Sequence, residues 1–247
     1  MPARKFVVYA QNHDQAGNRP GGERFGSLLS LEAQKLAAGA VLLSPFIPLL
    51  FMGEEYGETA PFLFFTSHSD AGLDDAVRRG RREEFAEFRW PAGFVDPADP
   101  ATFERSRPDA GLCAAQPHRR LLGLYTELLR LRRGLPALKE LSKRSATATA
   151  LEEQKTLLVV RASDAGSVFA AFHFGDRPAS VALRVPPGNW RRLLDSSDQR
   201  WGGPGARSAP EIGVSDGATL DLNAKSFLLY AQSPPDGTSE GEQGESS

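Results

Sequence analysis

The sequence FVVYAQNHDQAGNR, residues 6–19, decides the fold because an apolar run passes directly into a polar loop. Residues 6–10 are apolar, and most of them are β-branched or aromatic, which predicts a strand buried on both faces, as in a parallel sheet. Residues 11–22 are rich in Asn, Asp, Gly and Pro, which favour loops. We therefore expect the strand to end at a polar loop that carries functional side chains.

The next segment repeats this pattern. Between residues 23 and 43 the apolar residues recur at near-helical spacing, and Pro45 ends the pattern, which predicts a helix. Residues 48–52 form a second apolar run, and the polar sequence GEEYG follows at residues 53–57. The order strand, loop, helix, strand, loop is typical of parallel α/β architecture, in which sites lie where the strands end.

Two further helices are expected before residue 138. Residues 74–88 are laced with charges, and their arginines are followed directly by glutamates, so we interpret them as a solvated helical face rather than a phosphate site. Residues 91–108 are rich in Pro and Asp, which predicts a loop. Residues 118–133 form a strongly amphipathic pattern, which predicts a helix with one buried face.

Beyond residue 139 the pattern changes to short apolar runs separated by turns, which predicts an antiparallel sandwich. The expected strands are residues 156–161, 167–174, 180–185, 190–194, 218–222 and 225–231. The final residues are acidic and lack large apolar side chains, so we expect them to be disordered. The predicted units are therefore residues 1–138, residues 139–231 and a tail of residues 232–247.

Composition excludes several classes of function. The 247 residues carry 29 Lys and Arg against 31 Asp and Glu, a balance that predicts no binding to nucleic acid or to a membrane surface. Cys113 is the single cysteine, which excludes an intrachain disulfide and a thiolate metal cluster and favours the cytoplasm. The most apolar run, residues 36–52, is interrupted by prolines and is too short to span a membrane. We expect no metal and no cofactor.

The triplet Asn12-His13-Asp14 is the sharpest chemical feature, because it follows the first expected strand. One interpretation is a turn that holds a satisfied histidine. The other is a sugar subsite, since a carboxylate accepts two hydrogen bonds from vicinal hydroxyls while an imidazole donates one. The residues alone leave both interpretations open.

FVVYAQNHDQAGNR resembles the fourth signature region of the alpha-amylase superfamily of glycoside hydrolases. PFIPLLFMGEEYG at residues 45–57 resembles its strand-eight signature, and residues 118–138 resemble its last barrel helix. The resemblance covers residues 6–231. It implies an α/β plus all-β fold, with the last two βα units of a (β/α)8 TIM barrel followed by a C-terminal antiparallel β-sandwich.

Within the superfamily, NHDQAGNR followed by GER, together with FFTSHSD and RRGRREEFAEFRWP, most resembles the members that release trehalose. This resemblance implies maltooligosyltrehalose, or a related alpha-glucan, as substrate. The nearest alternative is the 1,4-alpha-glucan branching enzyme, which shares both strand signatures but transfers the cleaved chain. An alternative of another class is a non-catalytic glucan-binding module, which Trp190 and Trp201 in the sandwich region permit.

The resemblance implies roles for five residues of the first loop. Asp14 corresponds to the third essential carboxylate, which stabilises the oxocarbenium-like transition state without attacking. His13 lies in the same subsite. Asn12 and Gln15 shape the subsite wall, and Arg19 either orients a carboxylate or is an exposed surface arginine.

The strand-eight loop supplies the other candidates. The resemblance implies that the motif Glu54-Glu55-Tyr56 mostly supports the site, and we keep Glu54 and Tyr56 as candidate substrate-binding residues. Neither glutamate is expected to catalyse, because neighbours in sequence at a strand end point in different directions. His68 and the aromatic residues at 62, 64 and 65 are expected either to line the sugar groove or to pack in the ordinary way.

The nucleophile and the general acid of a retaining glycosidase lie about 5–5.5 Å apart. In the superfamily they belong to strands four and five, and a complete barrel takes about 250 residues, so we recognise neither group here. We expect the chain alone to be inactive. Its expected partner is the missing N-terminal half of the barrel, from the same gene or a separate chain, because two strands leave their edges exposed.

Overall fold

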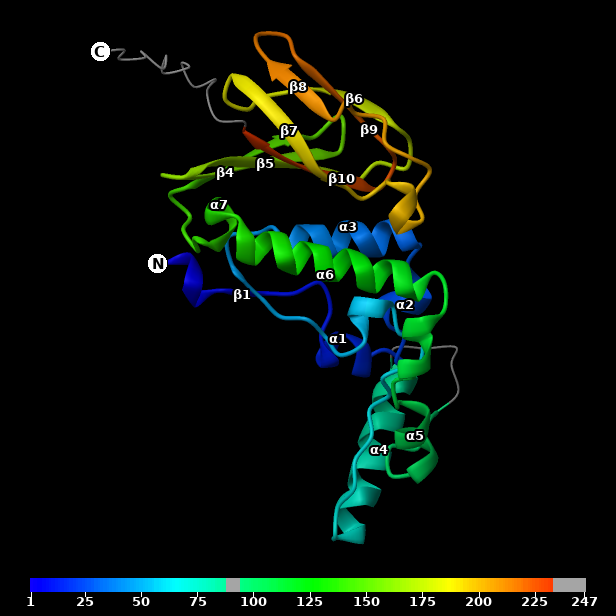
Figure 1. Cartoon of the computed structure of the whole chain (residues 1–247). Helices are drawn as coiled ribbons and strands as arrows, with labels where there is room; N and C mark the ends of the chain where they lie inside the picture. The colour runs from blue at the N-terminus through cyan, green and yellow to red at the C-terminus, as the bar shows by residue number, and fades with distance from the viewer. Residues whose placement is uncertain (88–93, 233–247) are drawn as a thin grey trace, which may run out of the picture.

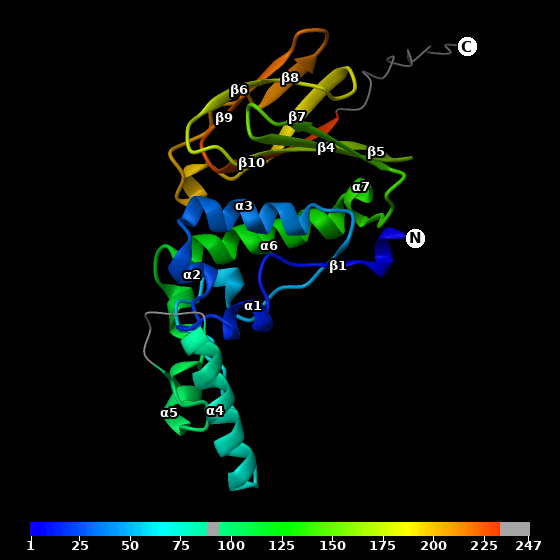
Figure 2. The same cartoon turned by 180° about the vertical axis from the view of Figure 1, so that it is seen from behind.

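The computed structural model describes residues 1–87 and 94–232. A β-sheet domain lies over a layer of two long helices, and two short strands lie on the other side of this layer (Figure 1). A helical arm projects from the end of the layer opposite to the N-terminus, as the view from behind also shows (Figure 2). The predicted tail, residues 232–247, lies outside the described residues except for Gln232, which is the last residue of a strand.

The strands β1 (Val7–Val8) and β2 (Ile47–Pro48) pair in parallel, which confirms the expected strand direction. Both are much shorter than the apolar runs that predicted them. The expectation that the first strand is buried on both faces is wrong, because Val7 and Tyr9 are exposed. Alternate side chains of a strand point to opposite faces, and in this chain only one face of the pair has a covering layer.

The helix expected over residues 23–43 is two helices, α2 (Phe25–Leu28) and α3 (Leu31–Leu42). Leu29 adopts an extended conformation between them. Ser30 then begins α3 as its N-cap, because its Oγ accepts a hydrogen bond from the amide of Ala33 at 3.3 Å. Side-chain capping of this kind satisfies a free amide and starts a new helix within one apolar pattern.

The described part of the arm comprises residues 58–87 and 94–117, which lie in the chain between β2 and the last long helix. It contains α4 (Ala71–Glu87), α5 (Pro100–Arg105) and a 3-10 turn, η3 (Ala110–Ala114). The helix α4 begins earlier than the predicted residue 74, and residues 88–93 lie outside the described part. The loop expected over residues 91–108 contains α5, because the Asp99 carboxylate caps the amide of Ala101 and Pro100 fits the first helical turn.

The helix α6 (His118–Gly134) runs beside α3, and the short α7 (Pro136–Lys139) follows it. Leu124 and Leu128 of α6 are fully buried against the sheet domain, together with Phe227 and Leu229. The long helix expected over residues 118–133 therefore has the buried face that its amphipathic pattern predicts. No helix among the described residues is both long and apolar enough to cross a membrane.

The sheet domain is antiparallel throughout, as predicted. Its six-stranded sheet has the order β3 (Ala146–Leu151), β4 (Thr156–Ser163), β5 (Gly166–His173), β10 (Ser226–Gln232), β7 (Gly188–Asp195) and β8 (Glu211–Val214). A second pair, β6 (Ala179–Ala182) with β9 (Thr219–Leu222), covers its other face and completes the sandwich. The strands β3 and β8 were not expected, because they contain mainly small or polar residues.

Both tryptophans of the sandwich region are buried. Trp190 is fully buried, packs edge-on against Phe169 and donates from its indole nitrogen to the carbonyl of Pro186 at 3.1 Å. Trp201, in the 3-10 turn η4 (Gln199–Trp201), is buried against the helix layer. Neither ring offers a free face to a sugar, so the feature that permitted a glucan-binding module is absent from these two residues.

Two buried cations, Lys35 and Arg161, join the helix layer to the sheet domain, and the half-buried Arg132 binds at the same turn as Arg161. Lys35 of α3 donates from Nζ to the carbonyls of Ser196 and Trp201, at 2.7 and 3.3 Å. Arg161 of β4 and Arg132 of α6 both donate to the carbonyl of Ser44, at 3.1 and 2.8 Å. Carbonyls at the end of a helix carry partial negative charge, so Arg161 and Arg132 stabilise the carboxyl end of α3 and the turn into β2.

Candidate active site

The parallel pairing of β1 and β2 brings the two predicted loops to one edge. The amide of Ile47 donates to the carbonyl of Phe6 at 3.0 Å, and the amide of Leu49 donates to the carbonyl of Val8 at 2.9 Å. Because both strands run in the same direction, residues 11–19 and residues 53–57 leave the pair at the same end. The candidate residues of both loops therefore belong to one region of the molecule.

The first loop places Asp14 in a short helix, α1 (His13–Gly17). Asn12 is its N-cap, with Oδ1 accepting from the amide of Gln15 at 2.9 Å. His13 Nε2 lies 3.3 Å from Asp14 Oδ1, and these two side chains are 69% and 70% exposed. The pair is thus held on a capped turn while its polar atoms remain open to a ligand.

Arg19 contacts a different carboxylate from Asp14. Its Nε donates to Oε2 of Glu23 at 3.0 Å, and both side chains are partly exposed. The backbone amide of Glu23 and then the Arg19 guanidinium lower the pKa of the Glu23 carboxyl. The ion pair of Arg19 with Glu23 therefore lies at the end of the first loop and joins its last residues.

The strand-eight loop turns its candidate residues inward. It forms the 3-10 turn η2 (Glu54–Tyr56) between Gly53 and Gly57, whose φ angles of 85° and 70° favour glycine. Glu54 is buried, and its Oε1 accepts a hydrogen bond from the Tyr125 hydroxyl at 3.3 Å. Burial raises the pKa of Glu54 to about 7.

Tyr56 is also buried and donates to Oε2 of Glu58 at 3.1 Å. Burial and this hydrogen bond raise the pKa of Tyr56 to about 12. Both candidates from this loop therefore bind other parts of the protein. Their placement favours a role in holding the loop over direct contact with a sugar.

Glu58 is a site residue that the sequence reasoning missed. Its carboxylate is almost fully buried and accepts from the amides of Thr59 and Ala60 at 2.7 Å and of Asp109 at 2.6 Å. These bonds join the outgoing and returning segments of the arm at its base. The available signal in the sequence was a further acidic residue directly after the GEEYG motif.

Arg24 was also missed, although it is part of the GER string. Its side chain is buried, and its guanidinium lies over the ring of Phe51 at 4.8 Å and the ring of Phe62 at 5.5 Å. One nitrogen donates to the carbonyl of Met52 at 2.6 Å. Arg24 therefore connects the first loop to the strand-eight loop, and burial lowers its pKa.

The arm approaches the first loop through Arg81 of α4. Arg81 donates to the carbonyl of Gly17 at 3.1 Å, pairs with Glu84 at 2.8 Å and lies over the ring of Phe64 at 4.6 Å. Arg78 of the same cluster pairs with Asp75 and Asp96. Arg78 and Arg81 are thus engaged with carboxylates, as a solvated face predicts, while Arg81 also contacts the loop of Asp14.

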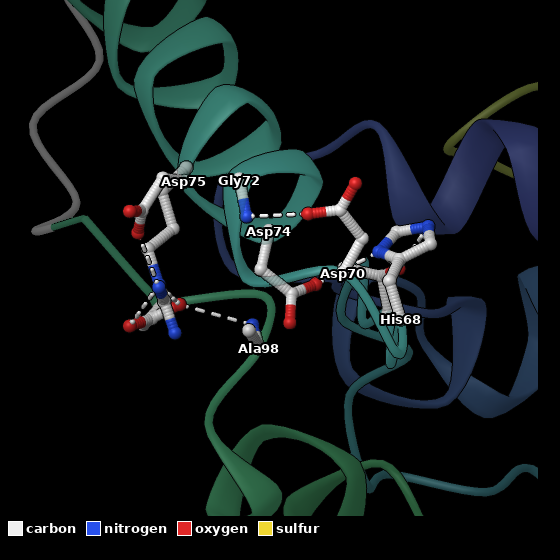
Figure 3. A network of polar contacts seen from close by, with 9 residues as sticks. His68, Asp70, Gly72, Asp74, Asp75 and Ala98 are labelled. Atoms are coloured by element: carbon white, nitrogen blue, oxygen red, sulfur yellow. Dashed lines mark hydrogen bonds and ion pairs between the residues drawn. The ribbon is translucent and has the colours of Figure 1, made fainter.

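His68 lies near the start of α4, where its Nδ1 is 2.8 Å from Oδ1 of Asp74 (Figure 3). Asp70 accepts from the amide of Gly72 at 2.8 Å in the same cluster. The aromatic residues expected at the groove differ in their surroundings. Phe62 packs against Phe51 and Phe65. Phe64 and Phe65 remain more than a third exposed. Within residues 1–87 and 94–232, no group of His, Cys, Asp or Glu has the arrangement of a metal site.

Comparisons of this chain with protein families and with known proteins agree with one another. Residues 149–233 match the family described as alpha amylase, C-terminal all-beta domain. The chain is 44% identical over 188 residues to the malto-oligosyltrehalose trehalohydrolase of Arthrobacter ramosus, covering 76% of this chain and 30% of that protein. It is 35% identical over 203 residues to the enzyme of the same name from Deinococcus radiodurans, covering 81% and 33%. The chain thus spans about a third of these relatives.

Solved structures support the same fold. A crystal structure from Salmonella typhimurium with an alpha-amylase assignment is 33% identical, with a TM-score of 0.72 over 94% of this chain and 36% of that one. A pullulanase from Anoxybacillus sp. LM18-11, complexed with maltotetraose, is 15% identical with a TM-score of 0.57, covering 94% and 28%. The second likeness concerns the fold alone.

Proposed function

Because the chain is homologous to a part of the malto-oligosyltrehalose trehalohydrolases, within the alpha-amylase superfamily of glycoside hydrolases, we propose that it forms the C-terminal portion of such an enzyme. Residues 1–138 would supply the last two βα units of the barrel and residues 139–231 the sandwich. The observation that carries this proposal is the exposed His13 and Asp14 pair at the end of β1, beside a parallel β2.

Asp14 is the proposed transition-state stabiliser. Positive charge develops on the sugar ring during cleavage, so a carboxylate that binds the flattening ring more tightly lowers the barrier. The carboxylate of Asp14 is open to solvent and anchored on a turn that Asn12 caps. His13 lies beside it as the proposed second ligand of the same sugar.

The other candidate residues lie around the pair of His13 and Asp14 and are proposed to support it. We propose that Asn12 and Gln15 form the subsite wall, since the cap between them fixes both residues. Arg19 acts through Glu23, which it pairs with. Glu54 and Tyr56 are proposed to hold the strand-eight loop, because both are buried against the protein's own side chains.

The proposed partner is polypeptide that completes the barrel, whether it belongs to the same gene or to a second chain. The side chains of Val7, Tyr9, Ile47 and Leu49 are exposed on the strand pair. Large apolar side chains gathered on one exposed strand face indicate a surface that another element covers. Further parallel strands would cover these side chains and would bring a nucleophile and a general acid.

The proposed substrate is maltooligosyltrehalose. The curated relatives described above carry the hydrolase name, which supports hydrolysis over the transfer reaction of a branching enzyme. The buried state of Trp190 and Trp201 removes the feature that permitted a separate glucan-binding module.

Trehalose release from maltooligosyltrehalose tests the proposal. The chain alone, the chain joined to the preceding part of the Arthrobacter ramosus relative, and the Asp14→Asn variant of that joined enzyme are compared. We expect no trehalose from the chain alone, and a kcat about 10²–10³-fold lower in the variant than in the joined enzyme. Asp176→Asn makes the same chemical change on the sheet domain and should leave the rate unchanged. Trehalose from the chain alone, or an undiminished rate in Asp14→Asn, contradicts the proposal.

A further inference from the structure

Glu54 is a buried carboxyl group at the end of β2 whose two oxygens differ in their surroundings. Oε1 accepts from the Tyr125 hydroxyl of α6 at 3.3 Å. Oε2 is shielded from solvent and has no hydrogen-bond partner within the described residues. A buried polar atom without a hydrogen-bond partner destabilises the folded state, so the presence of a carboxyl group here indicates a role in the site.

Gln11 is the residue that links this carboxyl to the first loop. Its side chain is buried and borders the same small space as the Glu54 carboxyl group. Its Oε1 accepts from the amide of Phe25 at 3.1 Å, at the start of α2. In the chain it directly precedes Asn12, whose side chain caps the helix of Asp14. A displacement of Gln11 is therefore transmitted at once to the turn that carries Asp14.

The same groups line one small space. Gln11, Gln34, Glu54 and Tyr125 border a cavity of about 10 Å³, together with Ala10, Phe25 and other residues of the neighbouring elements. This volume leaves no room for a sugar ring, because sites for small molecules measure hundreds of cubic ångströms. The polar side chains around Glu54 therefore contact one another, and its carboxyl group has no room to bind substrate directly.

We propose that Glu54 is a positioning residue for Asp14, which acts by holding Gln11 between α6 and the first loop. The proposal deepens the function proposed above, since it rests on Asp14 being the residue that needs a fixed place. It assigns Glu54 no contact with substrate.

The charge of Glu54 gives this arrangement a pH dependence. Burial raises the pKa of Glu54 to about 7, so the carboxyl group is largely neutral at pH 6 and largely ionised at pH 8. The groups that face it are Glu55 on the same turn, the neutral phenol of Tyr125 on α6 and the uncharged Gln11 and Gln34. None of them is a cation, so an ionised Glu54 is an uncompensated buried charge.

Amide hydrogen exchange of the full chain, without any sugar, tests the proposal. The reporters are the amides of Gln15, Ala16 and Asn18, which are bonded within the turn of Asp14, and amides of β5 serve as the internal reference. In Glu54→Leu we expect the reporters to exchange about tenfold faster relative to β5, the effect of one lost buried hydrogen bond. Glu54→Gln should restore slow exchange, and Glu55→Gln should leave it unchanged.

The pH profile separates positioning from simple packing. In the natural chain the relative exchange of the reporters should rise between pH 6 and pH 8, and Glu54→Gln should abolish this rise. His13 contacts Asp14 at 3.3 Å, so the profile is repeated in His13→Gln, where the rise should persist. A rise that vanishes with His13 and survives without Glu54 overturns the proposal.

Gln11→Met provides an independent variant if Glu54→Leu does not fold. It cuts the link while leaving Glu54 in place, and it should speed exchange of the same three amides. Unchanged exchange in Gln11→Met, or in a folded Glu54→Leu, overturns the proposal, and so does failure of Glu54→Gln to restore protection. Since no trehalose is measured, these outcomes are distinct from failure of the proposed function.

Discussion

Side chains on the two sides of the α3 and α6 layer differ in how completely they are buried. On the side of the sheet, Phe227 is fully buried, and its ring lies so close to Gly39 of α3 that a Cβ there would come within 2.7 Å. On the side of the two strands, Val7 and Tyr9 are 53% and 44% exposed. The sheet therefore covers one side of the helix pair, whereas the strand pair on the other side has an open outer face (Figure 1).

Polar groups distinguish the two sides as strongly as apolar ones. Lys35 and Arg161 are almost fully buried at the sheet interface, where backbone carbonyls accept their hydrogen bonds. On the strand side, Asp14 and His13 project from the end of β1 with most of their surface free. The difference teaches that the interface with the sheet is specified within this chain, whereas the proposed catalytic surface is built to meet something outside it.

Phe227→Ala tests the covered side and should have the largest effect. The substitution leaves a cavity between β10 and α3, where the ring now contacts Gly39 and stacks on Phe172. We expect a loss of about 3–5 kcal/mol in the free energy of unfolding, measured by urea denaturation. Phe174→Ala removes a ring that is half exposed and should change stability by less than about 0.5 kcal/mol. Equal effects of the two substitutions would contradict a tightly packed interface at Phe227.

The ionisation of Glu54 tests the strand side. Its pKa of about 7 in the folded chain lies above the ordinary value of 4.5, so the folded state holds the proton more strongly. The stabilising contribution is complete below about pH 4.5 and is lost as pH rises to about 7. At pH 8 Glu54→Gln should therefore be more stable than the natural chain, by up to about 3 kcal/mol, with little difference at pH 4.5. Unfolding midpoints at both pH values check this, and a constant difference contradicts it.

Arg161→Met tests the polar part of the covered interface. The guanidinium donates to the carbonyls of Leu43, Ser44 and Glu140, and the substitution leaves these acceptors without this partner. We expect a loss of about 2 kcal/mol in the free energy of unfolding. Arg130→Met removes an exposed pair with Glu127 and should cost less than about 1 kcal/mol. An unchanged stability in Arg161→Met would show that the interface depends on apolar packing alone.

Tyr9→Ser with Leu49→Ser should have the smallest effect on stability. Both side chains are exposed on the strand pair, so we expect a change of less than about 0.5 kcal/mol in the free energy of unfolding. Binding of an apolar fluorescent dye should fall, because the exposed apolar face is reduced. A loss of stability comparable to that of Phe227→Ala would mean that this face is already packed within the chain.

Local patterns predicted the order of elements and the most exposed candidates of the site. Hydrophobic spacing indicated the parallel pair, the helix α6 and the antiparallel sheet, because each pattern reflects which face of an element is buried. The resemblance of the first loop placed Asp14 and His13 at a strand end, where the structure has them. The break before α3 was missed because the apolar spacing continues across Ser30, and only its capping bond reveals a new helix.

The sequence by itself determined the fold class, through the periods of its apolar residues, and the identity of the exposed acid at the end of β1. The tertiary structure decided what the loop residues contact. Glu54 and Asp14 are both acids after parallel strands, yet Glu54 points inward to Tyr125 and Asp14 outward to solvent. Spacing along a chain cannot distinguish these cases, because burial of a side chain depends on partners such as Gln11 and Tyr125 that lie far away in sequence. Only the assembled neighbours set the charge, direction and role of each carboxyl group.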